Sequence, residues 1–331
     1  MKLEKRIDIL THLGNYLLTD SPGYAESRER AFHENKWFLP SYALGAGENI
    51  AHGMLQRDVL SAFAKKYQVQ DEAKDKKVGI IMAGNIPFVG MHDLICTFLF
   101  GYKASVKLSS KDTVLFKHLI DNLCDTYPEF TDYVSISEML KGCDAYIATG
   151  SNNSARYFEY YFGKYPHIIR KNKTSVAILE GNESTEELNA LADDIQLYFG
   201  LGCRNVTQLY VPKNYDFLPL LNALRKYDHY KEHDKYKNNF DYQLTIAIMN
   251  NVYYMSNDSI VLIENPQPFS PISQLHYQYF DDKKSIQDQL DLDKIQCIVG
   301  RGFTPFGKAQ TPNIDDFADG IDTMEFLQQL S

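Results

Sequence analysis

Hydrophobic residues follow two different spacings along the chain, and the change comes at a charged segment, residues 71–77. Before this segment, apolar residues such as Ile7, Leu10 and Leu13 recur every three or four positions, which predicts helices over residues 1–70. After it, short apolar runs alternate with further helical patterns. Such short runs are typical of strands that are buried on both faces of a parallel sheet.

The apolar runs and the helical patterns alternate through most of the remaining chain. The expected strands cover residues 78–83, 104–108, 144–149, 206–211, 259–264, 275–279 and 295–300, with another that runs from 174 into a loop at 181. The expected helices cover residues 91–100, 112–127, 155–162, 184–197, 215–227 and 240–250. This alternation predicts an α/β fold with parallel-rich sheets.

Three connections in the alternating region carry candidate chemistry. The loops Gly84–Gly90 and Gly150–Ser154 come directly after expected strands, which is where ligands bind in open parallel sheets. The third connection precedes the strand at 206–211 and carries Cys203 behind two glycines. Glycine leaves room for a substrate beside the thiol, and the adjacent Arg204 favours the thiolate, which is the nucleophilic form. The alternative interpretation is a small buried cysteine near a turn.

Composition and charge narrow the possible partners. The chain has 331 residues, of which 44% are hydrophobic and 23% charged, and this length suggests roughly two domains. Its net charge is -9 and it has no long basic run, so nucleic acid is excluded as the main partner. The longest apolar run, Leu94–Phe100, is too short to cross a bilayer, and we expect no membrane insertion.

The cysteines and histidines argue against a disulfide framework and against a metal site. The five cysteines are odd in number and never form a Cys-x-x-Cys pair, which favours a reducing compartment. The N-terminus has no apolar signal segment, so we expect a cytoplasmic protein. His229, Glu232 and His233 match an inverted zinc-peptidase pattern, but the surrounding residues are mostly Lys, Asp and Tyr, which indicates a solvated face. We therefore expect no metal.

The order of four motifs carries a family resemblance. Asn85 in Gly-Asn-Ile-Pro-Phe, Lys107-Leu108-Ser109-Ser110, Gly150-Ser151 and Cys203 follow one another along the chain. This order resembles the aldehyde dehydrogenase superfamily, which implies two Rossmann-type α/β lobes. Residues 35–331 resemble more closely the acyl-CoA reductases, which include the fatty acid reductase of bacterial luminescence. The closer match is carried by Gly-Leu-Gly-Cys-Arg-Asn, Ala-Thr-Gly-Ser-Asn and Phe-Gly-Lys-Ala-Gln.

The resemblance implies reduction of a fatty acyl-CoA or another acyl thioester to the aldehyde. Cys203 would attack the thioester carbonyl, and the Asn85 side chain with the Cys203 backbone N–H would stabilise the oxyanion. The thiol group of coenzyme A leaves, and an acyl-cysteine remains for reduction by a nicotinamide. Acyl chain length and the choice between coenzyme A and a carrier protein stay open.

The resemblance also implies a cofactor site formed by Lys107, Ser109, Ser110, Gly150 and Ser151. Lys107 would bind the adenosine ribose or a 2′-phosphate, and Gly150 and Ser151 would lie close to the pyrophosphate or nicotinamide. Ser110 replaces the glutamate that is usual in the superfamily, and a carboxylate there would repel a 2′-phosphate. We therefore expect NADPH rather than NADH.

Glu180 falls where the superfamily has its acid/base glutamate. The family pattern Glu-Leu-Gly-Gly is altered here to Leu-Glu-Gly-Asn. The resemblance implies a role in proton transfer for Glu180. A carboxylate that simply ends a strand is the alternative.

The expected division places the cofactor lobe at residues 1–178, completed by the tail at 301–331, and the catalytic lobe at 179–300. Two other functions stay open on the same scaffold. One is a cysteine acyltransferase or thioesterase, and the other is a non-catalytic subunit of an acyl-transfer complex. A homo-oligomer is also compatible with the sequence.

Overall fold

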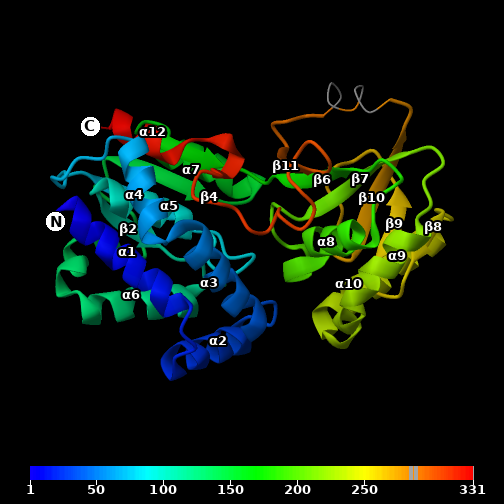
Figure 1. The fold of residues 1–331 in the computed structure, drawn as a ribbon, viewed down its shortest axis with the longest axis horizontal. Coiled ribbons are helices and arrows are strands. Elements are labelled where there is room, and N and C mark those ends of the chain that lie inside the picture. Colours follow the sequence, from blue (N-terminus) through cyan, green and yellow to red (C-terminus); the bar gives the residue numbers. More distant parts are fainter. Residues whose placement is uncertain (283–285, 287–289, 331) are drawn as a thin grey trace. The chain divides into compact units, whose positions relative to one another are not determined.

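The computed structural model describes residues 1–282, 286 and 290–330. The chain divides into two compact units, one formed by Met1–Asn172 with Pro312–Ser331 and the other by Lys173–Thr311 (Figure 1). Each unit is built on its own sheet of mainly parallel strands. The expected α/β class with parallel-rich sheets is confirmed.

Four helices open the first unit: α1 (Leu3–Leu17), α2 (Pro22–Glu34), α3 (Pro40–Met54) and α4 (Arg57–Lys66). Their apolar positions form buried stripes, and Ile7, Leu10 and Leu13 are each 3% exposed. Prolines occupy the first turn of α2 and of α3, where the missing N–H has no intrahelical partner to lose.

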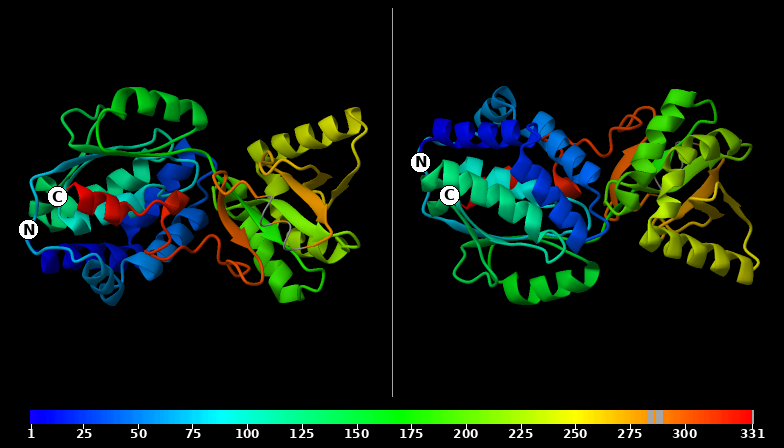
Figure 2. Two further views of the ribbon diagram at one scale, coloured as in Figure 1. Left: turned by 90° about the horizontal axis from the view of Figure 1, so that it is seen from above. Right: turned by 90° about the horizontal axis from the view of Figure 1, so that it is seen from below.

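The first unit contains a five-stranded parallel sheet in the order β3-β2-β1-β4-β5. The strands are β1 (Lys77–Ile81), β2 (Lys103–Lys107), β3 (Val134–Ile136), β4 (Ala145–Thr149) and β5 (His167–Arg170). The connecting helices are α5 (Met91–Phe100), α6 (Thr113–Thr126), η1 (Pro128–Asp132) and α7 (Asn152–Phe162). Figure 2 shows α7 on one face of this sheet and α5 and α6 on the other. The strand order reverses at β1, which creates the topological switch point where doubly wound sheets bind ligands.

The C-terminal segment, with η4 (Ala318–Gly320) and α12 (Thr323–Gln329), belongs to the first unit. Arg170 at the end of β5 donates to Asp93 of α5 at 2.6 Å and to Thr323 of α12 at 2.9 Å. All three side chains are buried. A buried charge pair needs such additional bonds to offset its loss of hydration, so this contact anchors α12 to the sheet.

The second unit contains a six-stranded sheet in the order β11-β6-β7-β10-β9-β8. The strands are β6 (Thr174–Ile178), β7 (Val206–Pro212), β8 (Tyr254–Ser256), β9 (Val261–Glu264), β10 (Gln274–Phe280) and β11 (Ile295–Val299). The helices are α8 (Thr185–Gln196), η2 (Leu197–Gly200), α9 (Leu218–Leu224), η3 (Arg225–Glu232) and α10 (Asp234–Met249). All strand pairs are parallel except β8 with β9.

The division of the chain differs from the sequence expectation at both boundaries. Residues 174–178 form β6, which pairs with β7 and β11 and not with any strand of the first unit. Residues 301–311 also belong to the second unit. The reason for the first difference is that an apolar run shows a strand but not its partners, because pairing is decided by packing.

The charged stretch before residue 240 is more ordered than its composition indicates. Helix α10 begins at Asp234, and the side chain of His233 accepts the Tyr236 N–H at 3.3 Å as its N-terminal cap. Across residues 1–282, 286 and 290–330, none of the helices combines the length and apolar character that a membrane crossing requires.

Candidate active site

Cys203 lies in a tight turn between η2 and β7. The Asn205 N–H donates to the Gly202 carbonyl at 3.0 Å, which closes the turn, and the Cys203 side chain is exposed. The preceding residues Tyr198, Phe199 and Gly200 have φ angles of 57°, 59° and 71°. Three consecutive left-handed residues reverse the chain direction sharply, which presents Cys203 at the amino end of β7.

Two residues that sequence reasoning missed lie directly behind this turn. Ser175 of β6 is fully buried, and its hydroxyl donates to the Cys203 carbonyl at 3.0 Å. The same hydroxyl oxygen lies 3.0 Å from Cys297 Sγ and accepts the Cys297 N–H at 3.2 Å. The sequence did contain a signal for Ser175, because a polar serine inside the apolar run 174–178 requires a hydrogen-bond partner. Cys297 offered none, because its approach depends on the pairing of β11 with β6.

The structure does not bring Glu180 to Cys203. Cys203 lies beside Ser175 at the amino end of β6, whereas Glu180 follows the carboxyl end of that strand. From Ser175 to Glu180 the chain advances five residues at about 3.3 Å per residue, so the two ends of the strand lie roughly 16 Å apart. Glu180 is exposed and its carboxylate lies 3.3 Å from Arg301, which also donates to Glu187.

The other candidate residues lie in the first unit, at the carboxyl ends of β1, β2 and β4: Asn85, Lys107, Ser109, Ser110, Gly150 and Ser151. Because these strands are neighbours and parallel, their following loops share one edge of the sheet. Lys107 ends β2 and is exposed, as is Ser110. The structure therefore groups these residues around the topological switch point.

Close contacts shape the loops at this edge. A side chain added at Gly84 would meet the Ser109 hydroxyl at 2.5 Å, so glycine allows the Asn85 loop and the Ser109 segment to touch. Ser151 caps α7 and accepts the Ser154 N–H at 3.2 Å. The N-terminus of a helix offers backbone N–H groups to an anion such as a phosphate.

Asp112 holds the loop that carries Asn85. One carboxyl oxygen of Asp112 accepts the Phe88 N–H at 2.8 Å, and the side chain is 2% exposed. Burial raises the pKa of Asp112 well above its ordinary value, and the Phe88 bond lowers it in part. Sequence reasoning missed this residue, since an aspartate before a helix usually caps it. Here the side chain makes no capping bond.

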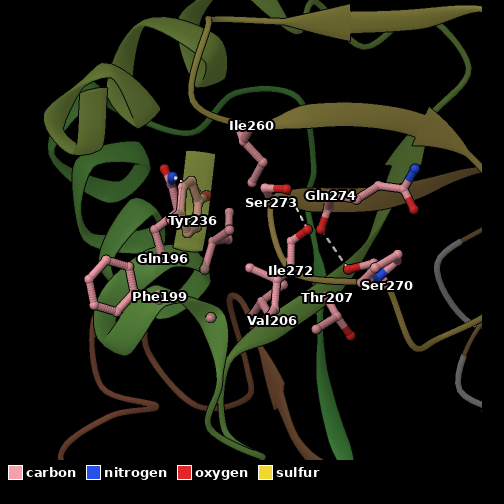
Figure 3. A pocket seen from close by; sticks show the side chains of 13 residues that line it. Gln196, Phe199, Val206, Thr207, Tyr236, Ile260, Ser270, Ile272, Ser273 and Gln274 are labelled. Carbon is pink, nitrogen blue, oxygen red and sulfur yellow. Dashed lines mark hydrogen bonds between the residues drawn. The ribbon is translucent and has the colours of Figure 1, made fainter. Parts of the chain in front are cut away.

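A small cavity lies on the η2 side of the Cys203 turn (Figure 3). Its walls come from the end of α8, η2, the start of β7, α10, the residue before β9 and the segment that leads into β10: Ile195, Gln196, Phe199, Gly200, Val206, Thr207, Tyr236, Ile260, Ser270, Pro271, Ile272, Ser273 and Gln274. Ser270 donates to the Gln274 carbonyl at 2.7 Å and closes one end of this segment. Cys203 is not part of the lining, so we assign the cavity no role in thioester chemistry.

Metal chemistry has no candidate site in the described part of the chain. No group of three or more His, Cys, Asp or Glu residues within it is arranged to hold a metal ion. His233 of the inverted zinc-peptidase pattern instead caps α10, and its ring lies 4.6 Å from that of Phe199. The histidine therefore has a structural role at this helix start.

A comparison with protein families identifies the family of this chain. The family model described as acyl-CoA reductase (LuxC) matches residues 24–221. The chain belongs to the acyl-CoA reductase (LuxC) family. The match spans every candidate site residue, and it confirms the resemblance that the order of motifs predicts. The curated protein sequences contain no significant match to the chain.

Solved structures of aldehyde dehydrogenases share the fold of this LuxC-family chain. The putative aldehyde dehydrogenase PutA from Anabaena variabilis is 13% identical, with a TM-score of 0.66 over 99% of this chain and 78% of that one. The succinic semialdehyde dehydrogenase of Streptococcus pyogenes, solved with NADP+, is 14% identical, with a TM-score of 0.62 over 86% and 73%. The P. syringae indole-3-acetaldehyde dehydrogenase AldA, solved as a cysteine-to-alanine mutant with NAD+ and IAA, is 12% identical, with a TM-score of 0.64 over 88% and 70%.

At 12–14% identity these structures establish an aldehyde dehydrogenase-like fold, but not a substrate or a cofactor. Family and fold together place the chain among oxidoreductases that act on acyl or aldehyde groups.

Proposed function

We propose that the protein reduces a long-chain fatty acyl-CoA, or a related acyl thioester, to the aldehyde with NADPH. The observation that carries the proposal is the exposed Cys203 on a braced turn in a chain of the acyl-CoA reductase family. An exposed thiol at such a turn suits acyl transfer, because a thiolate is both a good nucleophile and a good leaving group.

In the proposed reaction, Cys203 Sγ attacks the thioester carbonyl and forms the new carbon–sulfur bond. The backbone N–H of Cys203 donates to the oxyanion, and the family resemblance implies the side-chain amide of Asn85 as a second donor. The carbonyl re-forms as the bond to the sulfur of coenzyme A breaks, and this thiolate takes a proton from solvent. A reduced nicotinamide, when bound, supplies the hydride that converts the acyl group to the aldehyde level. Release of the aldehyde returns Cys203 to the thiolate.

The edge of the first unit fits a dinucleotide. Loops that follow β1, β2 and β4 lie along this edge, on both sides of the switch point, and the start of α7 offers N–H groups to a phosphate. Lys107 and Lys111 are exposed beside Ser110, and segment 107–111 contains no carboxylate. Asp112, the nearest acid in sequence, is buried against Phe88. These charges favour the 2′-phosphate of NADPH over the ribose of NADH.

Glu180 takes no part in the proposed acyl step. Glu180 follows the carboxyl end of β6, about 16 Å along the strand from the end beside which Cys203 lies. Its carboxylate is paired with Arg301. Hydrolysis would compete with reduction, so the distance of Glu180 from the level of Cys203 suits a reductase.

The test is to mix the purified protein with a long-chain acyl-CoA and NADPH, to follow nicotinamide absorbance and to measure intact mass. We expect cofactor oxidation, aldehyde formation and an acyl adduct on Cys203. Cys203→Ala should abolish both signals, whereas Cys297→Ala, which removes the neighbouring thiol, should keep the adduct. Undiminished turnover in Cys203→Ala would overturn the mechanism.

The other outcomes identify the alternatives. An adduct without cofactor oxidation would indicate an acyltransferase or thioesterase. Absence of both signals, with NADH and several chain lengths also tried, would indicate a non-catalytic subunit of an acyl-transfer complex.

A further inference from the structure

Asn205 is a fully buried side chain that joins the end of α8 to the Cys203 turn. Its Nδ2 group donates towards the carbonyls of Asp194, Ile195 and Leu197, at 3.1, 3.3 and 3.0 Å. Its Oδ1 atom accepts the Gly202 N–H at 2.8 Å. Every polar atom of this amide is therefore engaged, on two different chain segments.

An amide suits this position better than other side chains of its size. The last carbonyls of a helix have no intrahelical donor, so they require donors from elsewhere. The turn on the other side presents an N–H and requires an acceptor. Asparagine has the donor and the acceptor on one rigid group, whereas aspartate has the same shape but only acceptors when ionised.

The bonds of Asn205 and Ser175 fall on opposite sides of Cys203. Asn205 holds the N–H of Gly202, one residue before the cysteine, and Ser175 holds the carbonyl of Cys203 itself. Together they restrain the backbone that sets the direction of the Cβ–Sγ bond and of the Cys203 N–H. The Cys203 thiol and the Cys203 N–H both take part in the proposed attack on the thioester. A misplacement of reacting groups by about 1 Å can slow such a step about 100-fold.

We propose that Asn205 is a positioning residue for Cys203, which aligns the thiol and the adjacent backbone N–H by fixing the turn to the end of α8. This inference rests on the proposed function, because alignment has a consequence only where Cys203 attacks a thioester. It goes beyond that function in assigning the alignment to one buried side chain.

A purely structural role makes a different prediction from a positioning role. Loss of a structural bond lowers the folded fraction but leaves each folded molecule equally reactive. Loss of positioning slows acylation in molecules that are folded. Asn257 provides a matched control, since it is also a buried amide of the second unit. It accepts the Ser259 and Ile260 N–H groups and donates to the Leu221 carbonyl.

The experiment measures single-turnover acylation of Cys203 by a long-chain acyl-CoA with intact mass, normalised to the folded fraction from circular dichroism. We expect about a 100-fold slower acylation in Asn205→Asp and Asn205→Ala, with the half-saturating acyl-CoA concentration little changed. Asn257→Ala should melt earlier yet acylate at the wild-type rate. Alkylation by iodoacetamide, which needs no oxyanion alignment, should change less than about threefold in every variant.

Asn205→Ser keeps one polar group that can donate or accept a hydrogen bond, and we expect an intermediate rate. This milder change tests the inference where the other variants fold poorly. Wild-type acylation rates in the folded molecules of the Asn205 variants would overturn the positioning role and leave the proposed function intact. Failure of the wild-type protein to form an adduct would overturn both.

Discussion

At the scale of single residues, the approach to Cys203 combines backbone strain with aromatic packing. Tyr198 and Phe199 are both left-handed, and this conformation costs roughly 1–2 kcal/mol for each L-residue. Phe199 is 1% exposed, and its ring centroid lies 4.3 Å from that of Tyr230 and 5.8 Å from that of Tyr236. Burial and ring contacts of this size offset the backbone strain.

Ser110 is the residue whose replacement tests cofactor choice. We expect Ser110→Glu to lower kcat/KM for NADPH at least about tenfold and to affect NADH much less, because a carboxylate repels the 2′-phosphate and accepts ribose hydroxyls. The measurement is steady-state kinetics with both cofactors. Ser61→Glu, on the exposed face of α4, adds the same charge elsewhere in the unit and serves as the control. Equal losses for both cofactors would contradict the proposed site.

At the scale of elements, the last turn of α8 supports two segments that are far apart in sequence. Its backbone carbonyls accept from Asn205 next to the nucleophile. The carboxylate of Asp194 accepts the Gly307 N–H at 2.6 Å and the Ala309 N–H at 3.0 Å. Burial raises the pKa of Asp194 to about 7, although the two backbone bonds lower it in part.

This pKa makes stability depend on pH in a definite direction. Between pH 4 and pH 7 the folded protein keeps a proton on Asp194 that the unfolded chain has released. The free energy of unfolding therefore falls as pH rises through this window, by up to about 4 kcal/mol for a shift of about three units. Asp194→Asn replaces the titrating carboxyl group by an amide, so the stability difference between wild type and variant should change between pH 4 and pH 7. Urea unfolding at several pH values measures it, and a constant difference would contradict the assignment.

At the scale of the whole molecule, the two units differ in how the chain builds them. The second unit is one continuous segment, Lys173–Thr311, with its own six-stranded sheet. The first unit needs the C-terminal segment, which returns to contact Arg170 and Asp93 through Thr323. The Ile314 N–H also donates to the Gly53 carbonyl at 3.2 Å.

The difference predicts unequal behaviour of fragments. We expect residues 173–311, expressed alone, to fold and to melt cooperatively. Residues 1–172 should be unstable alone, because removal of α12 leaves the buried Arg170–Asp93 pair exposed on one side. This fragment should regain cooperative melting when a peptide of residues 312–331 is added. Thermal melts by circular dichroism test both fragments. A first fragment that is stable without the peptide would contradict this account.

Much of the fold could be predicted from local sequence alone. Strands β1 and β4 are short, mostly apolar runs, and such runs are read correctly because burial on both faces requires them. Strands β3 and β5 escaped prediction, since one has three residues and the other begins and ends with His167 and Arg170. Helix α10 starts earlier than expected, because its cap is a histidine, which is not among the usual capping residues.

The sequence by itself determined the α/β class, the candidate loops at the strand ends and the family, because these follow from periodicity and from the order of short motifs. Tertiary structure decided which residues meet. It placed Ser175 and Cys297 behind the Cys203 turn and separated Glu180 from it. It also made Asn205 a link between α8 and the nucleophile. The physical reason is that contacts between residues 28 or 122 positions apart are set by the packing and hydrogen bonding of distant segments, which local spacing does not encode.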